Sequence, residues 1–143
     1  MTVLVDSNVL IDIAYQDPVW LPWSRHKVVA ALAQGPLVIN PIIFAEFSYR
    51  YRKFEEADAL LPHDEFRRES LPFMAAFAAA KAFAAYRRAG GSRERPLPDF
   101  FIGAHAMVSG YKIITRDPAG YRSHFPGLEL ITPDTHPLES QIQ

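Results

Sequence analysis

Short apolar runs bounded by turn-forming residues recur along the chain and predict the strands of a buried sheet. Their apolar and β-branched residues suit strands that are covered on both faces. The predicted strands are Val3–Val5, Leu37–Ile39, Lys112–Thr115 and Leu128–Ile131. The polar segment from His63 to Ser70 has no clear period, so no element is predicted there.

Helices are predicted between these strands from the spacing of apolar residues and the positions of proline and glycine. The predicted helices are Asn8–Gln16, Pro22–Gln34, Ile42–Lys53, Phe54–Leu61, Leu71–Ala89, Asp99–Ser109 and Ala119–His124. Gly90–Pro96 is expected to be a flexible loop. Because strands alternate with helices, we predict an α/β protein with a mostly parallel sheet and helices on both faces. Its 143 residues suit one domain, expected over residues 1–132, with a polar C-terminal tail at 133–143.

Composition narrows the class of protein. The chain has no cysteine, which excludes disulfides and thiolate metal sites and is typical of a cytoplasmic protein. No apolar stretch is long enough to span a membrane, and no signal peptide is recognisable. The formal net charge is −1, so any contact with nucleic acid would depend on local basic patches. The candidate patches, which also fit solvated helix ends, are Arg50–Lys53, Arg67–Arg68, Arg87–Arg88 and Arg93 with Arg95.

Acidic residues stand where parallel strands end. Asp6 directly follows the first strand, and Asp117 closely follows the third. Glu46 lies within two turns of the start of the helix that leaves the second strand, and Asp99 opens the helix before the third. Right-handed crossovers bring the carboxyl ends of parallel strands to one edge of a sheet. We therefore expect these four carboxylates to reach one cleft.

Each of these acids also has a purely structural interpretation. Glu46 lies in an otherwise apolar segment, where a charge is costly unless it is paired, and Arg50 is placed one helical turn away for a salt bridge. Asp6 fits an Asx-turn, and Asp99 and Asp117 fit helix N-caps. The functional interpretation depends on all four acids being predicted at the same edge.

Clustered carboxylates repel one another, so a cation is expected among them. The other ligand atoms nearby are oxygens of Asn8 and Thr115, and oxygen ligands favour Mg²⁺ or Mn²⁺. The five histidines show no spacing typical of a zinc site, and His105 is expected to have a structural or surface role. An acid-lined Mg²⁺ site without a glycine-rich phosphate loop suits hydrolysis of phosphodiester bonds.

Four segments together resemble the PIN domain family, and in particular the VapC-type ribonucleases of bacterial toxin–antitoxin pairs. They are Val5–Asp12, Ala45–Phe47, Leu97–Ala106 and Ile114–Asp117. Their order and spacing extend the resemblance to about Ile131. The resemblance implies a three-layer α/β/α fold with a mostly parallel sheet of four or five short strands.

The resemblance also implies a site and an activity. The acidic metal site would be formed by Asp6, Glu46, Asp99 and Asp117, with Asn8 and Thr115 as supporting polar residues. Because the fourth acid varies within the family, Asp117 is expected to be less essential. Members of the family cleave RNA with Mg²⁺, or Mn²⁺ as a substitute, usually as a homodimer. We therefore expect a metal-dependent endoribonuclease that is the toxin of a type II pair and is held inactive by a cognate VapB-like antitoxin.

Two other functions are considered. The first is a PIN-like module that binds RNA or protein without cutting, although crowded carboxylates facing a phosphate backbone argue against it. The second is a phosphatase of the haloacid dehalogenase type, but that family needs a second aspartate where this chain has Asn8.

Arg116, beside the predicted pocket, is expected either to meet a phosphate or to lie on the surface. Aromatic residues of the first half suit a core, a dimer face or an antitoxin groove, and they are Trp20, Trp23, Phe44, Phe47, Tyr49 and Tyr51.

Overall fold

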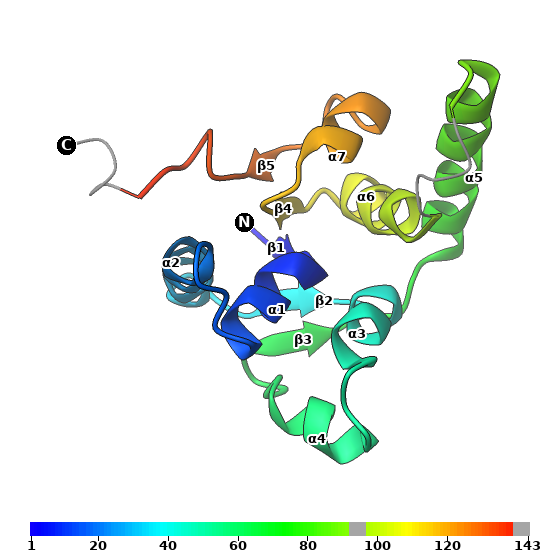
Figure 1. Cartoon of the computed structure of the whole chain (residues 1–143). Helices are drawn as coiled ribbons and strands as arrows, with labels where there is room; N and C mark the ends of the chain where they lie inside the picture. Colours follow the sequence, from blue (N-terminus) through cyan, green and yellow to red (C-terminus); the bar gives the residue numbers. More distant parts are fainter. Residues whose placement is uncertain (92–96, 139–143) are drawn as a thin grey trace.

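The computed structural model describes residues 1–91 and 97–138, with a five-stranded sheet at its centre (Figure 1). The strands are β1 (Val3–Val5), β2 (Leu37–Ile39), β3 (Phe66–Arg68), β4 (Lys112–Ile114) and β5 (Leu130–Ile131). The helices are α1 (Ser7–Ala14), α2 (Leu21–Leu32), α3 (Pro41–Ser48), α4 (Phe54–Ala59), α5 (Phe73–Arg88), α6 (Leu97–Ser109) and α7 (Ala119–His124). None of the helices in the described ranges is long and apolar enough to cross a membrane. Most of the predicted loop Gly90–Pro96, including Arg93 and Arg95, and the end of the predicted tail lie outside the described residues.

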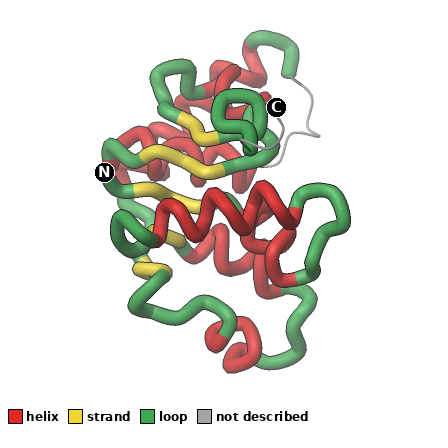
Figure 2. Tube along the Cα trace, turned by 90° about the vertical axis from the view of Figure 1, so that its left-hand side faces the viewer, coloured by secondary structure: helices red, strands yellow, loops and turns green. Residues whose placement is uncertain are grey.

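The sheet is parallel throughout, with the strand order β3-β2-β1-β4-β5. β1 is therefore central, and it pairs with a strand from far along the chain, with Val5 opposite Ile114. Figure 2 shows helices on either side of the strands, which gives three layers. The predicted α/β/α fold with a parallel sheet is confirmed, with five strands.

β3 is the strand that the sequence did not predict. It contains Phe66, Arg67 and Arg68, of which Phe66 alone is buried. It lies at an edge of the sheet, where charged side chains are common and an apolar pattern is not required. Predicted helix ends also shift by a few residues, most of all in α3, which ends at Ser48 instead of Lys53.

Two apolar clusters hold the layers together. The larger cluster includes the strands, whose residues Leu4, Val5 and Ile113 are fully buried. The smaller cluster contains Ala75, Ala79, Phe100, Ala104 and Phe125 and joins α5, α6 and α7. α6 contacts both β4 and α5, so the helix that carries Asp99 is held from two directions.

The residues after β5 fold back onto α2. Trp23 Nε1 donates a hydrogen bond of 2.8 Å to the carbonyl of His136, and Leu138 packs against the larger cluster. Thr132 is fully buried, and its backbone N–H donates to the Thr135 hydroxyl at 3.1 Å. Residues 133–138 of the predicted tail therefore contact the domain.

Candidate active site

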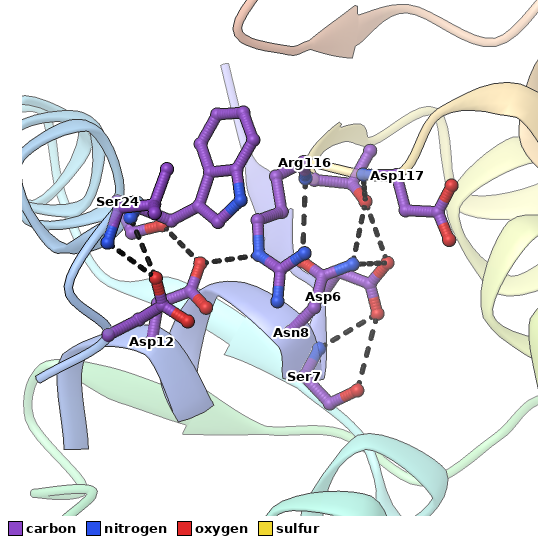
Figure 3. Close-up of polar contacts among 11 residues, drawn as sticks. Asp6, Ser7, Asn8, Asp12, Ser24, Arg116 and Asp117 are labelled. Carbon is purple, nitrogen blue, oxygen red and sulfur yellow. Dashed lines mark hydrogen bonds and ion pairs between the residues drawn. The ribbon is translucent and has the colours of Figure 1, made fainter. Parts of the chain in front are cut away.

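Asp6 lies at the carboxyl end of the central strand and caps α1. Its backbone N–H continues the sheet by donating to the carbonyl of Ile114 at 3.0 Å. Its carboxylate is buried and accepts hydrogen bonds from the Ser7 N–H (2.8 Å), the Thr115 hydroxyl (2.9 Å) and the Tyr121 hydroxyl (2.9 Å). Figure 3 shows Asp6 beside Ser7 and Asn8 of the first helix and Asp117 from far along the chain.

Thr115 and Asn8 join the end of β4 to the start of α1. The Thr115 hydroxyl accepts hydrogen bonds from Asn8 Nδ2 (3.3 Å) and from the Asp117 N–H (3.1 Å). The Asn8 side-chain oxygen accepts from the Arg116 N–H at 3.4 Å. Because a hydroxyl has a single proton, its two acceptor contacts leave that proton for Asp6. Asn8 and Thr115, the two residues predicted to support the site, therefore both lie beside Asp6.

Glu46 is carried by α3, whose start is fixed by two residues. Asn40 Oδ1 accepts from the Ile43 N–H at 2.9 Å, and Pro41 occupies the first turn, where a helix N–H has no partner within the helix. The Glu46 side chain is half-buried and accepts a hydrogen bond of 3.0 Å from the Ser7 hydroxyl. Since Ser7 follows Asp6 directly, this bond brings the second acid to the first.

The salt bridge considered between Glu46 and Arg50 is not present. Arg50 Nε donates instead to the Tyr49 hydroxyl at 2.8 Å. Within residues 1–91 and 97–138, no ion pair joins Arg50 to Glu46. Glu46 therefore faces Asp6 as an acid whose charge is not cancelled by the arginine of the next turn.

Asp6, Glu46 and Asp99 act on one another as charges. Burial, with a contribution from the Asp99 charge, raises the pKa of Asp6 from 3.8 to about 6, although hydrogen bonds favour its ionised form. Burial and the charge of Asp6 raise the pKa of Glu46. Burial and these carboxylates hold the pKa of Tyr121 well above its usual value, so its hydroxyl remains a donor. Acids from the N-cap of α1, from α3 and from the first turn of α6 therefore share one electrostatic site.

Asp117 is placed differently from the other three acids. Its carboxylate is exposed, and in Figure 3 it points away from the carboxylate of Asp6. The predicted N-cap is also not seen, because α7 begins at Ala119 after Pro118 without a side-chain cap. The structure thus brings three of the four predicted acids together and leaves Asp117 beside them, where its role stays a prediction.

The raised pKa of Asp6 predicts a pH dependence of stability in metal-free buffer. Between about pH 4 and 6 the folded chain binds more protons at Asp6 than the unfolded chain, so the free energy of unfolding falls as the pH rises through this window. The decrease amounts to about 3 kcal/mol at most. Urea denaturation in EDTA should show this decrease in the wild-type chain and a smaller one in Asp6→Asn. Equal pH slopes in the two proteins would contradict the burial of an ionisable carboxyl at this position.

Tyr121 is a residue of the site that the sequence did not reveal. It lies in α7, where its ring and that of Phe125 pack against Gly103 of α6. A Cβ at position 103 would lie 2.5 Å from the Phe125 ring and 3.2 Å from the Tyr121 ring. Glycine at this position therefore lets α7 approach α6 closely enough for Tyr121 to reach Asp6. The only signal of this in the sequence is a glycine inside a predicted helix, where it is unfavourable unless packing requires it.

Asp12 and Arg116 form a second polar cluster beside the site (Figure 3). Asp12 is buried, and its Oδ2 accepts hydrogen bonds from the Ser24 hydroxyl (2.8 Å) and from Arg116 Nε (2.7 Å). The Arg116 guanidinium also lies over the Trp20 ring, 5.8 Å from its centroid. Arg116 therefore ties the end of β4 to α1 and α2.

His105 is fully buried and links the two helices that carry Glu46 and Asp99. Asn40 uses its oxygen as the cap of α3, so its Nδ2 donates to His105 Nδ1 at 3.0 Å. His105 Nε2 then donates to Glu69 at 3.2 Å. These bonds connect the start of α3 to the middle of α6, so of the two roles considered for His105 the structure supports the structural one and not a place on the surface.

The donor chemistry of this site, but not its present geometry, suits a divalent cation. As they stand, no three His, Cys, Asp or Glu side chains in the described part of the chain are grouped closely enough to hold a metal ion. The donors that Asp6, Glu46 and Asp99 provide are oxygens, which suit Mg²⁺ or Mn²⁺. The raised pKa values of Asp6 and Glu46 reflect the cost of ionising buried, neighbouring carboxyls, and a cation would offset that cost.

Known proteins share this architecture. The model of the PIN domain family matches residues 3–122, so the chain belongs to that family. VapBC2 from Rickettsia felis, solved bound to a DNA fragment from its promoter, is similar with a TM-score of 0.72 at 15% identity over 92% of this chain and 98% of that chain. VapBC-1 from nontypeable Haemophilus influenzae gives 0.68 at 17% identity over 92% and 98%. A toxin–antitoxin complex from Klebsiella pneumoniae gives 0.64 at 21% identity over 93% and 98%.

These identities are low, so the likeness to the solved structures concerns the fold. Among curated proteins, no significant match is found. The resemblance to the PIN domain family that four short segments indicated is confirmed by the family match and by the shared architecture.

Proposed function

We propose that the chain is a metal-dependent endoribonuclease that hydrolyses phosphodiester bonds of RNA. The observation that carries the proposal is the electrostatic interaction of Asp6 with Glu46 and Asp99 at the carboxyl end of the central strand, where the pKa values of Asp6 and Glu46 are raised. Buried like charges cost stability, so their presence is explained best by a cation that they bind. Membership of the PIN domain family supports a nuclease.

Asp6 and Asp99 would hold Mg²⁺, or Mn²⁺ in its place, and Glu46 and Asp117 would contact it directly or through water. When bound, such an ion lowers the pKa of water and neutralises charge that develops on the scissile phosphate. The hydrogen bond from Ser7 keeps Glu46 turned toward Asp6, where it can orient the attacking water.

The remaining polar residues hold the acids in position. The Thr115 hydroxyl fixes one oxygen of Asp6, and Asn8 fixes the direction of that hydroxyl. Tyr121 donates to the same Asp6 oxygen from α7. Together with the Ser7 N–H, which donates to the other oxygen, these donors fix the orientation of the Asp6 carboxylate.

We further propose that the chain is the toxin of a type II toxin–antitoxin pair and acts in the cytoplasm as a homodimer. The solved complexes from R. felis, H. influenzae and K. pneumoniae are VapBC or toxin–antitoxin assemblies, and the chain covers 98% of each matched chain. A VapB-like antitoxin is accordingly the partner we expect to inhibit it.

The test is cleavage of a mixed cellular RNA pool by the purified chain, with Mg²⁺ or Mn²⁺ and with EDTA. We expect cuts at discrete positions that require the metal and are absent with Asp99→Asn, because this change removes a charged oxygen ligand at constant size. Mapping the cut ends would identify the RNA target in the same experiment.

Failure to cut RNA with either metal, by a folded chain free of any partner, would overturn the proposal. Retention of RNA binding in that case would favour the alternative of a PIN-like binding module. Calorimetry with Mn²⁺ separates the two functions further, since a nuclease site should bind the ion and lose that binding in Asp99→Asn.

A further inference from the structure

A series of ring contacts runs from the core to the surface at the ends of α1 and α3. The buried ring of Phe47 has its centroid 5.4 Å from that of Tyr51, and Tyr51 stacks on Tyr15 at 6.0 Å with 24° between the planes. The Arg50 guanidinium lies 4.7 Å from the ring centroid of Tyr15 and 5.3 Å from that of Tyr49. We call the outer four residues, Tyr15, Tyr49, Arg50 and Tyr51, the aromatic–arginine stack.

The outer part of the aromatic–arginine stack is open to solvent. Tyr49 is 69% exposed and Tyr15 is 40% exposed, so neither ring is needed to fill the core. The bond from Arg50 Nε to the Tyr49 hydroxyl fixes the guanidinium plane. In the ranges 1–91 and 97–138, Arg50 forms no ion pair with a carboxylate. The stack therefore presents flat rings and a positive charge that is not cancelled by an acid.

The stack lies where the two helices of the acidic site end. Asp6 is the N-cap of α1 and Tyr15 is its C-cap, nine residues or about 14 Å further along the axis. α3 carries Glu46 and has Tyr49 as its C-cap, three residues or about 5 Å further along the axis. When an RNA strand is bound across the acids, a nearby nucleotide of that strand can therefore reach the stack.

We propose that the aromatic–arginine stack binds an unpaired base of a single-stranded RNA substrate next to the cleaved bond. This inference rests on the proposed function. Proteins hold unpaired bases by stacking them on aromatic rings and on arginine planes, and this mode accepts every base because each has a π face. Carboxylates without their cation repel phosphate, whereas the uncancelled charge of Arg50 attracts the RNA backbone beside the site.

The experiment measures binding without cleavage, in the full-length Asp6→Asn chain with Mg²⁺. The probe is a single-stranded RNA oligonucleotide with 2-aminopurine placed in turn at each position around the cleavage site. Fluorescence anisotropy gives the affinity, and quenching of 2-aminopurine reports stacking. Adding Tyr49→Ala should weaken binding by roughly 5- to 100-fold and remove the quenching at one position. Tyr49→Phe keeps the ring but loses the bond to Arg50, so its affinity should fall between the two.

Arg50 has a matched control in Arg25, an exposed arginine of α2 outside the stack. Arg50→Lys keeps the positive charge but loses the planar guanidinium group, so it should reduce both the affinity for RNA and the quenching. Arg25→Ala should change the affinity for RNA by less than about twofold. Because Tyr49 and Arg50 are exposed, thermal unfolding of their variants should match that of the parent chain.

Three results would overturn the inference. The first is unchanged affinity and quenching in Tyr49→Ala. The second is an equal loss of affinity for duplex RNA, which would mean attraction to phosphates alone. The third is unchanged RNA binding with loss of binding to a protein partner, which would assign the surface to that partner. If the wild-type chain cleaves RNA in any of these cases, the proposed function stands and only the role of the stack fails.

Discussion

Asp6→Asn is expected to lower the rate of RNA cleavage by about a thousandfold or more while the fold is kept. Asparagine preserves the size of the side chain and an oxygen that accepts from the Ser7 N–H, and the Tyr121 hydroxyl can turn to accept from the new amide, so the hydrogen bond that is lost is the one donated by the Thr115 hydroxyl. The negative charge that would bind the cation is lost. Single-turnover cleavage with Mg²⁺ measures the rate, and calorimetry with Mn²⁺ measures the loss of metal binding.

The matched control is Asp64→Asn, the same change at an exposed aspartate before β3. It should leave the cleavage rate, metal affinity and melting temperature as they are in the wild-type chain. Full activity of Asp6→Asn, with a normal circular dichroism spectrum, would remove Asp6 from the metal site.

Gly103→Val is expected to destabilise the chain by about 3 kcal/mol and to lower the melting temperature by roughly 10 °C. Replacing a glycine inside a helix usually stabilises it, since glycine is a poor helix former. Here the first added carbon would lie 2.5 Å from the buried ring of Phe125, so the ring and α7 must move. That movement would also withdraw Tyr121 from Asp6, so metal affinity should fall together with stability.

Gly127→Val is the control, because a Cβ at Gly127 meets nothing within 4 Å. Its melting temperature should stay close to that of the wild-type chain, and thermal denaturation followed by circular dichroism compares the two. Phe125→Leu should recover part of the stability lost in Gly103→Val, since a smaller side chain makes room for the new one. Equal melting temperatures of Gly103→Val and wild type would show that α7 is not fixed against α6 as described.

The elements that meet at the central strands could be predicted from local patterns. β1 and β2 are apolar runs followed by Asp6 and Asn40, residue types that cap helices, so both the strand ends and the helix starts were marked in the sequence. Asp6 and Glu46 are expected near one another because of these strand ends and helix starts and because β1 and β2 pair in parallel. β3 could not be predicted in this way, because an edge strand with two arginines has no apolar pattern.

The contacts between distant elements could not be predicted from the sequence. The bond from Tyr121 to Asp6 depends on how α7 packs on α6, and the stack on Arg50 depends on how the ends of α1 and α3 meet. Asp117 shows the reverse problem. Its place after β4 predicts the correct edge of the sheet, but the direction of its side chain is decided by the turn that follows.

The pairing of β1 with β4 also determines when the site can form during synthesis. The hydroxyl that holds Asp6 belongs to a residue 109 positions further along the chain. At elongation rates of about 5 to 20 residues per second this separation corresponds to roughly 5 to 20 seconds of translation. A nascent chain therefore carries Asp6 and Glu46 for several seconds without a complete site, and the proposed activity would begin only when β4 has emerged and paired. A substitution that delayed this pairing would postpone the activity without altering the finished site.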